Sequence, residues 1–281
     1  MARRLIQILG AGFVFALLTA LTQLGGLVFL ASLLGAWLMR RAGRAKSSAA
    51  LVGIAVFAVA LPVLNLIVVP PLAPLNDRVQ LPCEATAQRP YAPLTSITCA
   101  LGRNYARSEV AIMLKVMVRD LSAQYPGITV AYLDAGFPFL DGFPLPPHLS
   151  HDDGRSLDLA YFYKDEAGYV PLSAPSPIGY WGFETPPADE PSPCADKVRW
   201  LTLRWDMSWF QHFVRKDLTL DEERTAAMLR WLVEKGPEHG VSKILLEPYM
   251  AKRLGVVSPL IRFQGCRAAR HDDHVHVEVG S

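Results

Sequence analysis

Two long uncharged runs lie in the first part of the chain. Residues 5–39 and 47–76 contain no Asp, Glu, Lys or Arg. One helix over the first run would measure roughly 50 Å at about 1.5 Å per residue, whereas the hydrocarbon core of a bilayer is about 30 Å thick. The first run therefore predicts two membrane spans that turn near Gly25 and Gly26, since glycine tolerates a reversal. The second run predicts one further span, kinked near Pro62.

These runs define a membrane region, residues 1–74, with three predicted transmembrane helices at about 5–21, 23–39 and 49–70. Its basic residues fall in two clusters, at 3–4 and at 40–46. The positive-inside rule places both clusters in the cytoplasm, and a third crossing then delivers residues 75–281 to the opposite side. A secretory signal peptide is the alternative, but its apolar region normally spans only about 7–15 residues.

After residue 75 the continuous apolar runs give way to short periodic segments. Apolar residues repeat at helical spacing over 108–124, and Thr219 with Glu222 forms a capping box for a second helix through about residue 235. Other segments predict strands at 128–133, 157–163, 241–246 and 275–279, and a short helix at 249–254. Because strands and helices do not alternate strictly, we expect an α+β domain.

Composition and charge exclude several classes of protein. Hydrophobic residues make up 51% of the 281-residue chain and charged residues only 19%, against about 25% in a typical globular protein. Disorder, a coiled coil and a wholly soluble cytosolic enzyme are therefore disfavoured. The first 76 residues hold six basic residues and no acidic one, which leaves a net charge of about −4 on the remainder. This mildly acidic part argues against nucleic-acid binding, and uncharged spans without an internal repeat argue against a transporter.

All four cysteines follow the membrane region, at positions 83, 99, 194 and 266. An even number of cysteines in an exported domain favours two disulfides, with three possible connectivities. No CxxC pair is present, so a zinc site made of cysteines is disfavoured.

Five of the seven histidines fall in two short segments, 147–158 and 271–278, whereas His212 and His239 stand alone and are expected to pack or to lie on the surface. In the second segment, polar and apolar residues alternate from His274 to Val279, so a strand would carry His274 and His276 on one face. In the first segment, Asp158 enters an apolar strand, where a buried carboxylate needs a partner.

A divalent cation would supply that partner. Two imidazole nitrogens, one carboxylate oxygen and a water form an ordinary open zinc site, which keeps one position for substrate. Either segment alone is weak support, because a histidine-rich strand end is often a solvated surface. Together the two segments predict one Zn²⁺ site.

The two segments resemble a known family. His151 and Asp158, which are separated by six residues including Gly154, resemble the His-x6-Asp motif of the LAS metallopeptidases. The run from His271 through His274 to His276 is similar to the HxxHxH run of the penicillin-insensitive murein endopeptidases within that group. The motifs cover about twenty residues, and their order extends the resemblance over roughly 75–281.

The resemblance implies a site and a fold. Zn²⁺ would be held by three ligands, which are His151, Asp158 and His276. His274 would lie near the attacking water, His271 close by, and His148 and Arg155 at the rim or beside the substrate. The implied fold is an α+β domain with a small antiparallel sheet that carries the metal.

Two positions depart from the endopeptidase pattern. Ser156 stands where that branch usually has an aspartate, which resembles the carboxypeptidase branch instead. That second branch places a glutamate base three residues before its last ligand, and the corresponding residue here is Asp273. Either His274 or Asp273 could therefore act as the base.

The expected function follows from the resemblance and the expected location. We expect a multi-pass protein of a bacterial inner membrane whose C-terminal domain, on the periplasmic side, hydrolyses D-amino-acid peptide bonds of peptidoglycan. Arg103, Arg107 or Arg155 could bind a free carboxylate of such a peptide. A D-alanyl-D-alanine carboxypeptidase or dipeptidase of the same metal class is one alternative. A non-catalytic wall-binding module with a degenerate metal site is the other. Peptidoglycan peptide and lipid bilayer are the expected partners, and the sequence indicates no nucleic acid and identifies no protein partner.

Overall fold

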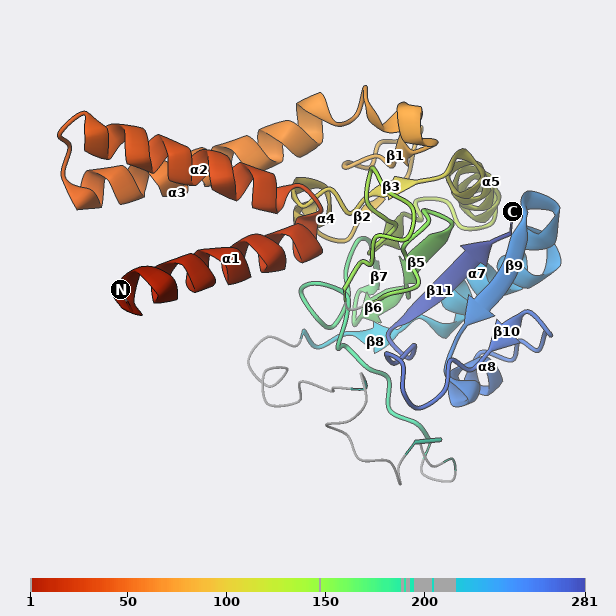
Figure 1. Ribbon diagram of the computed structural model, residues 1–281. Coiled ribbons are helices and arrows are strands. Elements are labelled where there is room, and N and C mark those ends of the chain that lie inside the picture. The colour runs from red at the N-terminus through yellow and green to blue at the C-terminus, as the bar shows by residue number, and fades with distance from the viewer. Residues whose placement is uncertain are drawn as a thin grey trace.

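The computed structural model describes residues 2–146, 148–187, 190, 193–194, 204 and 216–280. Its N-terminal part is helical and its C-terminal part is a mixed α+β domain, as the sequence predicts (Figure 1). His212, one of the two isolated histidines, lies outside the described residues. The other, His239, stacks on Trp231 at 5.7 Å between ring centroids and is a packing residue.

Three apolar helices extend from one side of the domain: α1 (Ala2–Thr22), α2 (Gly25–Arg41) and α3 (Lys46–Val63), which continues as a π-helical turn, η1 (Leu64–Val68). Two helical segments are long and apolar enough to cross a membrane, Ala2–Thr22 and Lys46–Val68. The helix at the second predicted span, α2, has 17 residues and ends in two arginines, so it falls short of that length. Pro62, where the sequence predicts a kink, lies in α3 two residues before the π-helical turn begins.

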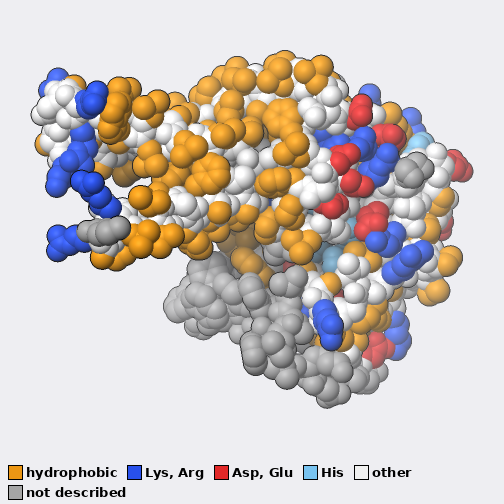
Figure 2. Space-filling view, viewed as in Figure 1, with side chains coloured by type: hydrophobic (Ala, Val, Ile, Leu, Met, Phe, Trp, Pro, Cys, Tyr) orange, Lys and Arg blue, Asp and Glu red, His pale blue; other side chains and the backbone are white. Residues whose placement is uncertain are grey.

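Charge and apolar surface are separated along these helices. Lys and Arg side chains gather at the end remote from the domain, and hydrophobic side chains cover the length between (Figure 2). The basic side chains come from α1 and from the two ends that meet between α2 and α3, and they are Arg3, Arg4, Arg40, Arg41, Arg44 and Lys46. The two clusters that the sequence places on one side of a membrane therefore lie together.

The domain is built on a six-stranded sheet with the order β10-β9-β11-β5-β4-β2. Its strands are β2 (Tyr91–Pro93), β4 (Val130–Tyr132), β5 (Ser156–Ala160), β9 (Val241–Leu245), β10 (Ile261–Arg262) and β11 (His274–Val279). The four inner strands run antiparallel, and each outer strand pairs in parallel with its neighbour. The expected small antiparallel sheet is thus present, with a parallel strand added at either edge.

Smaller elements surround this sheet. Two minor sheets pair β1 (Val79–Gln80) with β3 (Tyr105–Ala106), and β6 (Tyr163–Asp165) with β7 (Gly168–Val170) and β8 (Thr219–Leu220). Short helical segments are η2 (Ala73–Asn76), α4 (Ser96–Ala100), η4 (Gly236–His239) and α8 (Pro248–Arg253). Disulfides join Cys83 to Cys99 and Cys194 to Cys266, a pairing that the sequence leaves open.

Helices α5 (Ser108–Gln124) and α7 (Glu222–Glu234) pack against one face of the six-stranded sheet. Their apolar side chains meet Leu157, Leu159, Val275 and Val277, all fully buried, so the opposite face carries the alternate residues of β5 and β11. The N-cap of α7 is Asp221, whose carboxylate accepts from the Arg224 amide, so the predicted capping box is wrong in position. Thr219 instead pairs with Lys164 in the β6–β8 ladder.

Candidate metal centre

The register between two strands brings the two histidine segments together. His276 of β11 lies directly opposite Asp158 of β5 in the antiparallel ladder. Side chains at opposed positions point to the same face of a sheet with their β-carbons about 5 Å apart. His276 Nδ1 accordingly lies 2.8 Å from Asp158 Oδ1, although the two residues are 118 positions apart in sequence. The valines and leucines on either side hold this geometry by filling the core on the other face.

His151 completes a group of three donors. Its Nε2 lies 3.0 Å from Asp158 Oδ1 and 3.1 Å from His276 Nδ1. Its other nitrogen, Nδ1, lies 2.6 Å from the Ala135 carbonyl oxygen, which leaves Nε2 as the atom aimed at the cluster. His151, Asp158 and His276 are each at most 1% exposed, and their donor atoms are spaced as one metal ion requires.

A second group shares Asp158. His148 Nδ1 lies 2.8 Å from Asp158 Oδ2, and His274 Nε2 lies 3.8 Å from Asp158 Oδ1. Its three members, which are His148, Asp158 and His274, are also close enough to hold a metal ion. The centroid of the His271 ring lies 5.0 Å from that of His274 and 5.7 Å from that of His276. All five clustered histidines therefore lie around one carboxylate.

The buried carboxylates at the site outnumber the guanidiniums that pair with them. Four aspartates at the site are at most 3% exposed, namely Asp134, Asp158, Asp272 and Asp273. Two of them have guanidinium partners, since Arg103 pairs with Asp134 and Arg270 pairs with Asp272. Among the described residues, Asp158 and Asp273 have no Lys or Arg partner. With neutral imidazoles the site is left with two negative charges, which a divalent cation would compensate.

Two buried polar atoms at the site have no hydrogen-bond partner within the described part of the chain. They are His274 Nε2 and Asp273 Oδ2. The other ring nitrogen of His274 is hydrogen-bonded to Asp273, so the carboxylate orients the imidazole. Because an unpaired buried nitrogen is costly, the free Nε2 indicates a position for a water, an ion or a substrate atom. Three nitrogen and oxygen donors with an unpaired nitrogen beside them fit an open zinc site.

Burial and neighbouring charges shift the pKa values of the histidines in different directions. Burial lowers the pKa of His148 despite Asp158, and burial together with His274 holds the pKa of His271 well below its ordinary value. Burial opposes protonation of His151 too, but Asp158 outweighs it and raises the pKa. Burial is likewise overcome at His274, where Asp158 and Asp273 raise the pKa to about 9. His274 thus holds a proton more strongly than an ordinary imidazole.

A series of hydrogen bonds through Tyr180, Asp134 and Arg103 holds Asp158 in place. The Tyr180 hydroxyl lies 2.7 Å from Asp158 Oδ2 and 2.9 Å from Asp134 Oδ2. Asp134 in turn accepts two bonds from Arg103, at 2.7 and 2.8 Å. Burial and the two carboxylates hold the pKa of Tyr180 well above its ordinary value, so the hydroxyl remains a donor. Asp158 is therefore fixed by contacts on both of its oxygens.

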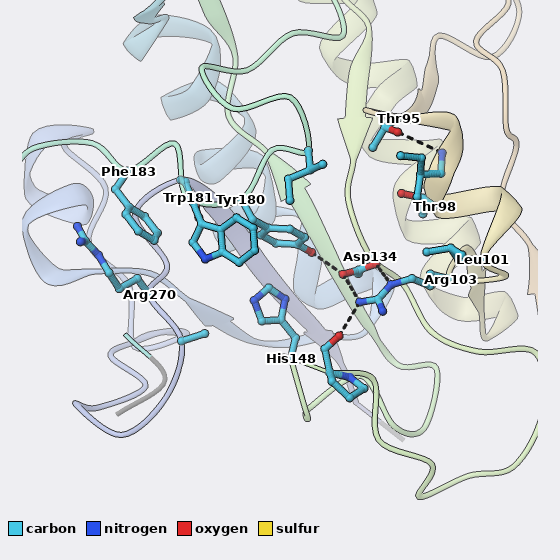
Figure 3. Close-up of a pocket in the computed structure, with 15 residues that line it drawn as sticks. Thr95, Thr98, Leu101, Arg103, Asp134, His148, Tyr180, Trp181, Phe183 and Arg270 are labelled. Atoms are coloured by element: carbon cyan, nitrogen blue, oxygen red, sulfur yellow. Dashed lines mark hydrogen bonds and ion pairs between the residues drawn. The ribbon is translucent and has the colours of Figure 1, made fainter. Parts of the chain in front are cut away.

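A pocket of about 250 Å³ adjoins the cluster (Figure 3). His148, Tyr180, Asp134 and Arg103 form its inner wall, and the remainder is largely apolar. The apolar lining comes from α4 and its following residue on one side and from the 178–183 segment on the other, and includes Ile97, Leu101, Ile178, Trp181 and Phe183. Arg270 stacks on Phe183 at 3.8 Å from the ring centroid. Trp181 and Phe183 thus line the pocket from the same segment.

The structure brings most of the predicted site residues together. The cluster contains the three predicted ligands and four of their predicted neighbours, which are His151, Asp158, His276, His148, His271, Asp273 and His274. Arg155 lies elsewhere, because its guanidinium donates to the Gly280 carbonyl at the far end of β11. Arg107 is also remote, since it pairs with Asp141 and with the Asp153 carbonyl.

Three supporting residues have roles that sequence reasoning missed. The sequence gives Asp134 and Tyr180 no role at the metal, and it suggests Arg103 only as a binder of a substrate carboxylate. One signal was available, namely that Asp134 is an acid directly after an apolar strand, as Asp158 is an acid within one. The contacts among the three span 31 and 46 positions and leave no periodic pattern.

No family model matches this sequence, and no curated protein matches it. The geometry of the site therefore carries the functional conclusion.

Proposed function

We propose that this chain is a membrane-anchored zinc peptidase that hydrolyses D-amino-acid peptide bonds of peptidoglycan, similar to the penicillin-insensitive murein endopeptidases. The observation that carries the proposal is the convergence of His151, Asp158 and His276 within 3.1 Å contacts on one buried face of the sheet. These are the positions that match the LAS ligand motif, and the donor set of two imidazoles and one carboxylate suits Zn²⁺.

A divalent ion at this position would supply Lewis-acid activation of a water and of the scissile carbonyl. The chain's own part is to move the proton. His274 is placed for that role because its Nε2 is unpaired and faces Asp158, while Asp273 holds its Nδ1. A cation bound to Asp158 would offset the carboxylate that raises the pKa of His274, so that the imidazole could accept a proton near neutral pH. Of the two candidate bases, we therefore assign proton transfer to His274 and orientation to Asp273.

The pocket favours an endopeptidase over a carboxypeptidase. A carboxypeptidase needs a cation to bind the terminal carboxylate of its substrate. The two guanidiniums that line the pocket among the described residues, Arg103 and Arg270, already pair with Asp134 and Asp272. The walls otherwise offer apolar and aromatic side chains, which suit a neutral residue inside a peptide chain.

The proposed anchor is multi-pass. Helix α1 would measure about 31 Å and the segment Lys46–Val68 about 34 Å, close to the thickness of a hydrocarbon core. Helix α2, at about 26 Å, is antiparallel to α3 and places its arginines beside the other basic residues. We propose that all three helices cross a bacterial inner membrane, with the basic end in the cytoplasm and the disulfide-bonded domain on the oxidising, periplasmic side.

Mass spectrometry of muropeptides tests the function. The zinc-loaded, detergent-solubilised full chain is incubated with purified crosslinked muropeptides, and the product masses identify the bond cut. We expect loss of the crosslink in the wild type and none with His151→Ala. His239→Ala is the matched control, since it removes a histidine that stacks on Trp231 away from the site. An unchanged digest from the zinc-loaded wild type would favour the wall-binding alternative, and release of a terminal D-alanine would favour the carboxypeptidase.

A further inference from the structure

The helices and the domain are joined without a flexible linker. Ten residues separate the end of η1 at Val68 from the start of β1 at Val79, and they are folded rather than extended. Val69 is 1% exposed and Ala73 is fully buried, and both pack against Tyr105 of the domain. Leu24 and Leu64 from the helices join the same apolar cluster. The domain therefore has little freedom to move away from the helix ends.

Polar contacts lock the same junction. Gln23, in the turn between α1 and α2, has a positive φ of 58°, an unfavourable conformation for a residue with a side chain. Its amide group donates to the Phe139 carbonyl and accepts from the Phe139 amide at 3.0 Å. Asn65 is fully buried in η1, and its side-chain amide donates to the Ala100 carbonyl at the end of α4. The backbone carbonyl of Asn65 accepts from the Tyr105 hydroxyl. Each helix end is thus bonded to a different part of the domain.

The pocket wall belongs to this junction. Helix α4, which carries Ile97 and Thr98 of the pocket, packs against α3 and η1. Arg103, which holds Asp134 at the inner wall, also donates to the Leu21 carbonyl at the end of α1, at 3.4 Å. If α1 spans the bilayer as proposed, Leu21 lies at the outer boundary of the hydrocarbon core. The pocket then lies at headgroup level.

Exposed apolar side chains around the junction agree with this depth. Leu75 is 81% exposed and Leu140 is 62% exposed. Leu75 follows the third helix, and Leu140 follows Phe139, which is bonded to the α1–α2 turn. Ile97, on the pocket wall itself, is 54% exposed. Such side chains are favoured at the surface of a bilayer rather than in open water.

We propose that the pocket takes its substrate from the membrane itself, as a peptide carried on a lipid anchor in the same bilayer. The apolar wall at Ile97 and Leu101 faces the headgroup region, and the histidine cluster lies at its inner end. A domain held so closely cannot reach peptides in wall polymer far from the membrane. This inference rests on the proposed peptidase function and on the three-span anchor.

Vesicle assays test the inference directly. The full chain is reconstituted in vesicles, and one peptide substrate is supplied at equal bulk concentration in three forms: lipid-anchored in the same vesicles, lipid-anchored in separate vesicles, and free in solution. We expect cleavage in the same vesicles to be faster by about tenfold or more than in either other form. Equal rates in all three forms would overturn the inference and leave the peptidase function standing. No cleavage of any form by the zinc-loaded chain would overturn both.

An undocked variant separates close docking from simple tethering. A Gly/Ser insertion of about 20 residues after Asp77 adds a reach of about 25 Å, and Gln23→Ala with Asn65→Leu removes the side-chain bonds of these two residues to Phe139 and Ala100. We expect this variant to cleave the peptide on separate vesicles faster than the wild type does. The ratio of the rate in the same vesicles to the rate in separate vesicles should therefore fall. If the ratio between the two rates is unchanged, docking does not restrict the substrate and the inference is wrong. The same insertion with His151→Ala is the inactive control.

Discussion

At the residue scale, Asp158 is the side chain on which the whole cluster depends. Both of its oxygens are occupied, Oδ1 by His151 and His276 and Oδ2 by His148 and Tyr180. Burial opposes ionisation of this carboxyl, but the neighbouring His151, His274 and His148 hold its pKa well below its ordinary value. When the neighbouring histidines are neutral, this fully buried carboxylate needs a cation as its partner.

Asp158→Asn removes the charge and keeps the shape of the side chain. We expect zinc affinity to fall by more than about 100-fold, since even a change in a residue that supports a ligand typically costs 10–100-fold. Zinc competition with a fluorescent chelator measures the change, and peptidase activity should fall with it. Asp165→Asn, at the exposed end of β6, is the matched control and should bind zinc like the wild type. Equal zinc affinity in the two variants would exclude Asp158 as a ligand.

Tyr180→Phe removes only the hydroxyl that bridges Asp158 and Asp134. We expect zinc affinity to fall by about 10–100-fold while the fold persists, because the ligand carboxylate loses one of the bonds that orient it. Tyr169→Phe is the control, since its hydroxyl bonds to the backbone of Thr129 away from the site. If Tyr180→Phe lowered Tm but left zinc affinity unchanged, Tyr180 would be a packing residue only.

The candidate metal ligands could be predicted from the sequence, but the residues that hold them in place could not. Alternation around His276 and the apolar neighbours of Asp158 fix the face on which each side chain lies, whatever the rest of the chain does. The contacts of Tyr180 and Arg103 depend on how loops cross above the sheet. Such contacts follow from tertiary packing and have no period.

Helices α5 and α7 are joined through a partly buried carboxylate, that of Asp120. Asp120 of α5 accepts from Trp231 Nε1 of α7 at 3.0 Å and from Lys235 at 3.1 Å. The Trp231 hydrogen bond is the main reason that the pKa of Asp120 is lowered, to about 2. The two helices that form the core are therefore joined by an interaction that depends on ionisation.

Asp120→Asn tests this contact. Because the pKa is lower in the folded state than the ordinary 3.8, the stabilisation is present above about pH 4 and is lost as the pH falls towards 2. We expect the variant to lose about 1 kcal/mol at pH 7, or a few degrees in Tm. Thermal denaturation of the detergent-solubilised chain across pH measures this difference, which should shrink below pH 4. A Tm difference that stays constant down to pH 2 would contradict the assignment.

The elements themselves followed their sequence patterns to different degrees. The helix predicted at 108–124 has those bounds in the structure, because its apolar stripe is continuous and a proline follows it. The capping box failed because Thr219 is taken by a strand pairing with Lys164, so the chain caps the helix two residues later, at Asp221. A local capping signal does not report on a competing partner 55 residues away.

At the scale of the whole molecule, the two disulfides close loops of different size. Cys83–Cys99 spans 16 positions and Cys194–Cys266 spans 72. The shorter one ties α4, and with it a wall of the pocket, to the segment that follows β1.

Removing each disulfide by paired Cys→Ala changes should lower stability in proportion to loop entropy. We expect losses of about 3 kcal/mol for Cys83–Cys99 and about 4 kcal/mol for Cys194–Cys266. Thermal denaturation of both variants measures the order, and non-reducing peptide mapping confirms the pairing in the wild type. A larger loss for the shorter loop would show that contacts of α4, rather than chain entropy, dominate.

The overall arrangement was only partly visible in the sequence. Long apolar runs reveal helices because length and composition alone define them. Four cysteines leave three connectivities, and the docking of helices on the domain depends on single polar residues such as Gln23 and Asn65, which composition treats as minor interruptions. Those two residues decide how the parts are joined.

Gln23 also sets an order of events during biosynthesis. Its partner, Phe139, is translated 116 residues later, so the first two helices are complete long before the contact can form. With the helices inserted as proposed, the amide of Gln23 bonds to water at the outer surface until Phe139 has been translocated. The contact between Gln23 and Phe139 therefore forms only after Phe139 has crossed the membrane. A nascent chain arrested before residue 139 emerges should hold its helices in the bilayer with the hairpin turn still accessible to water-borne reagents.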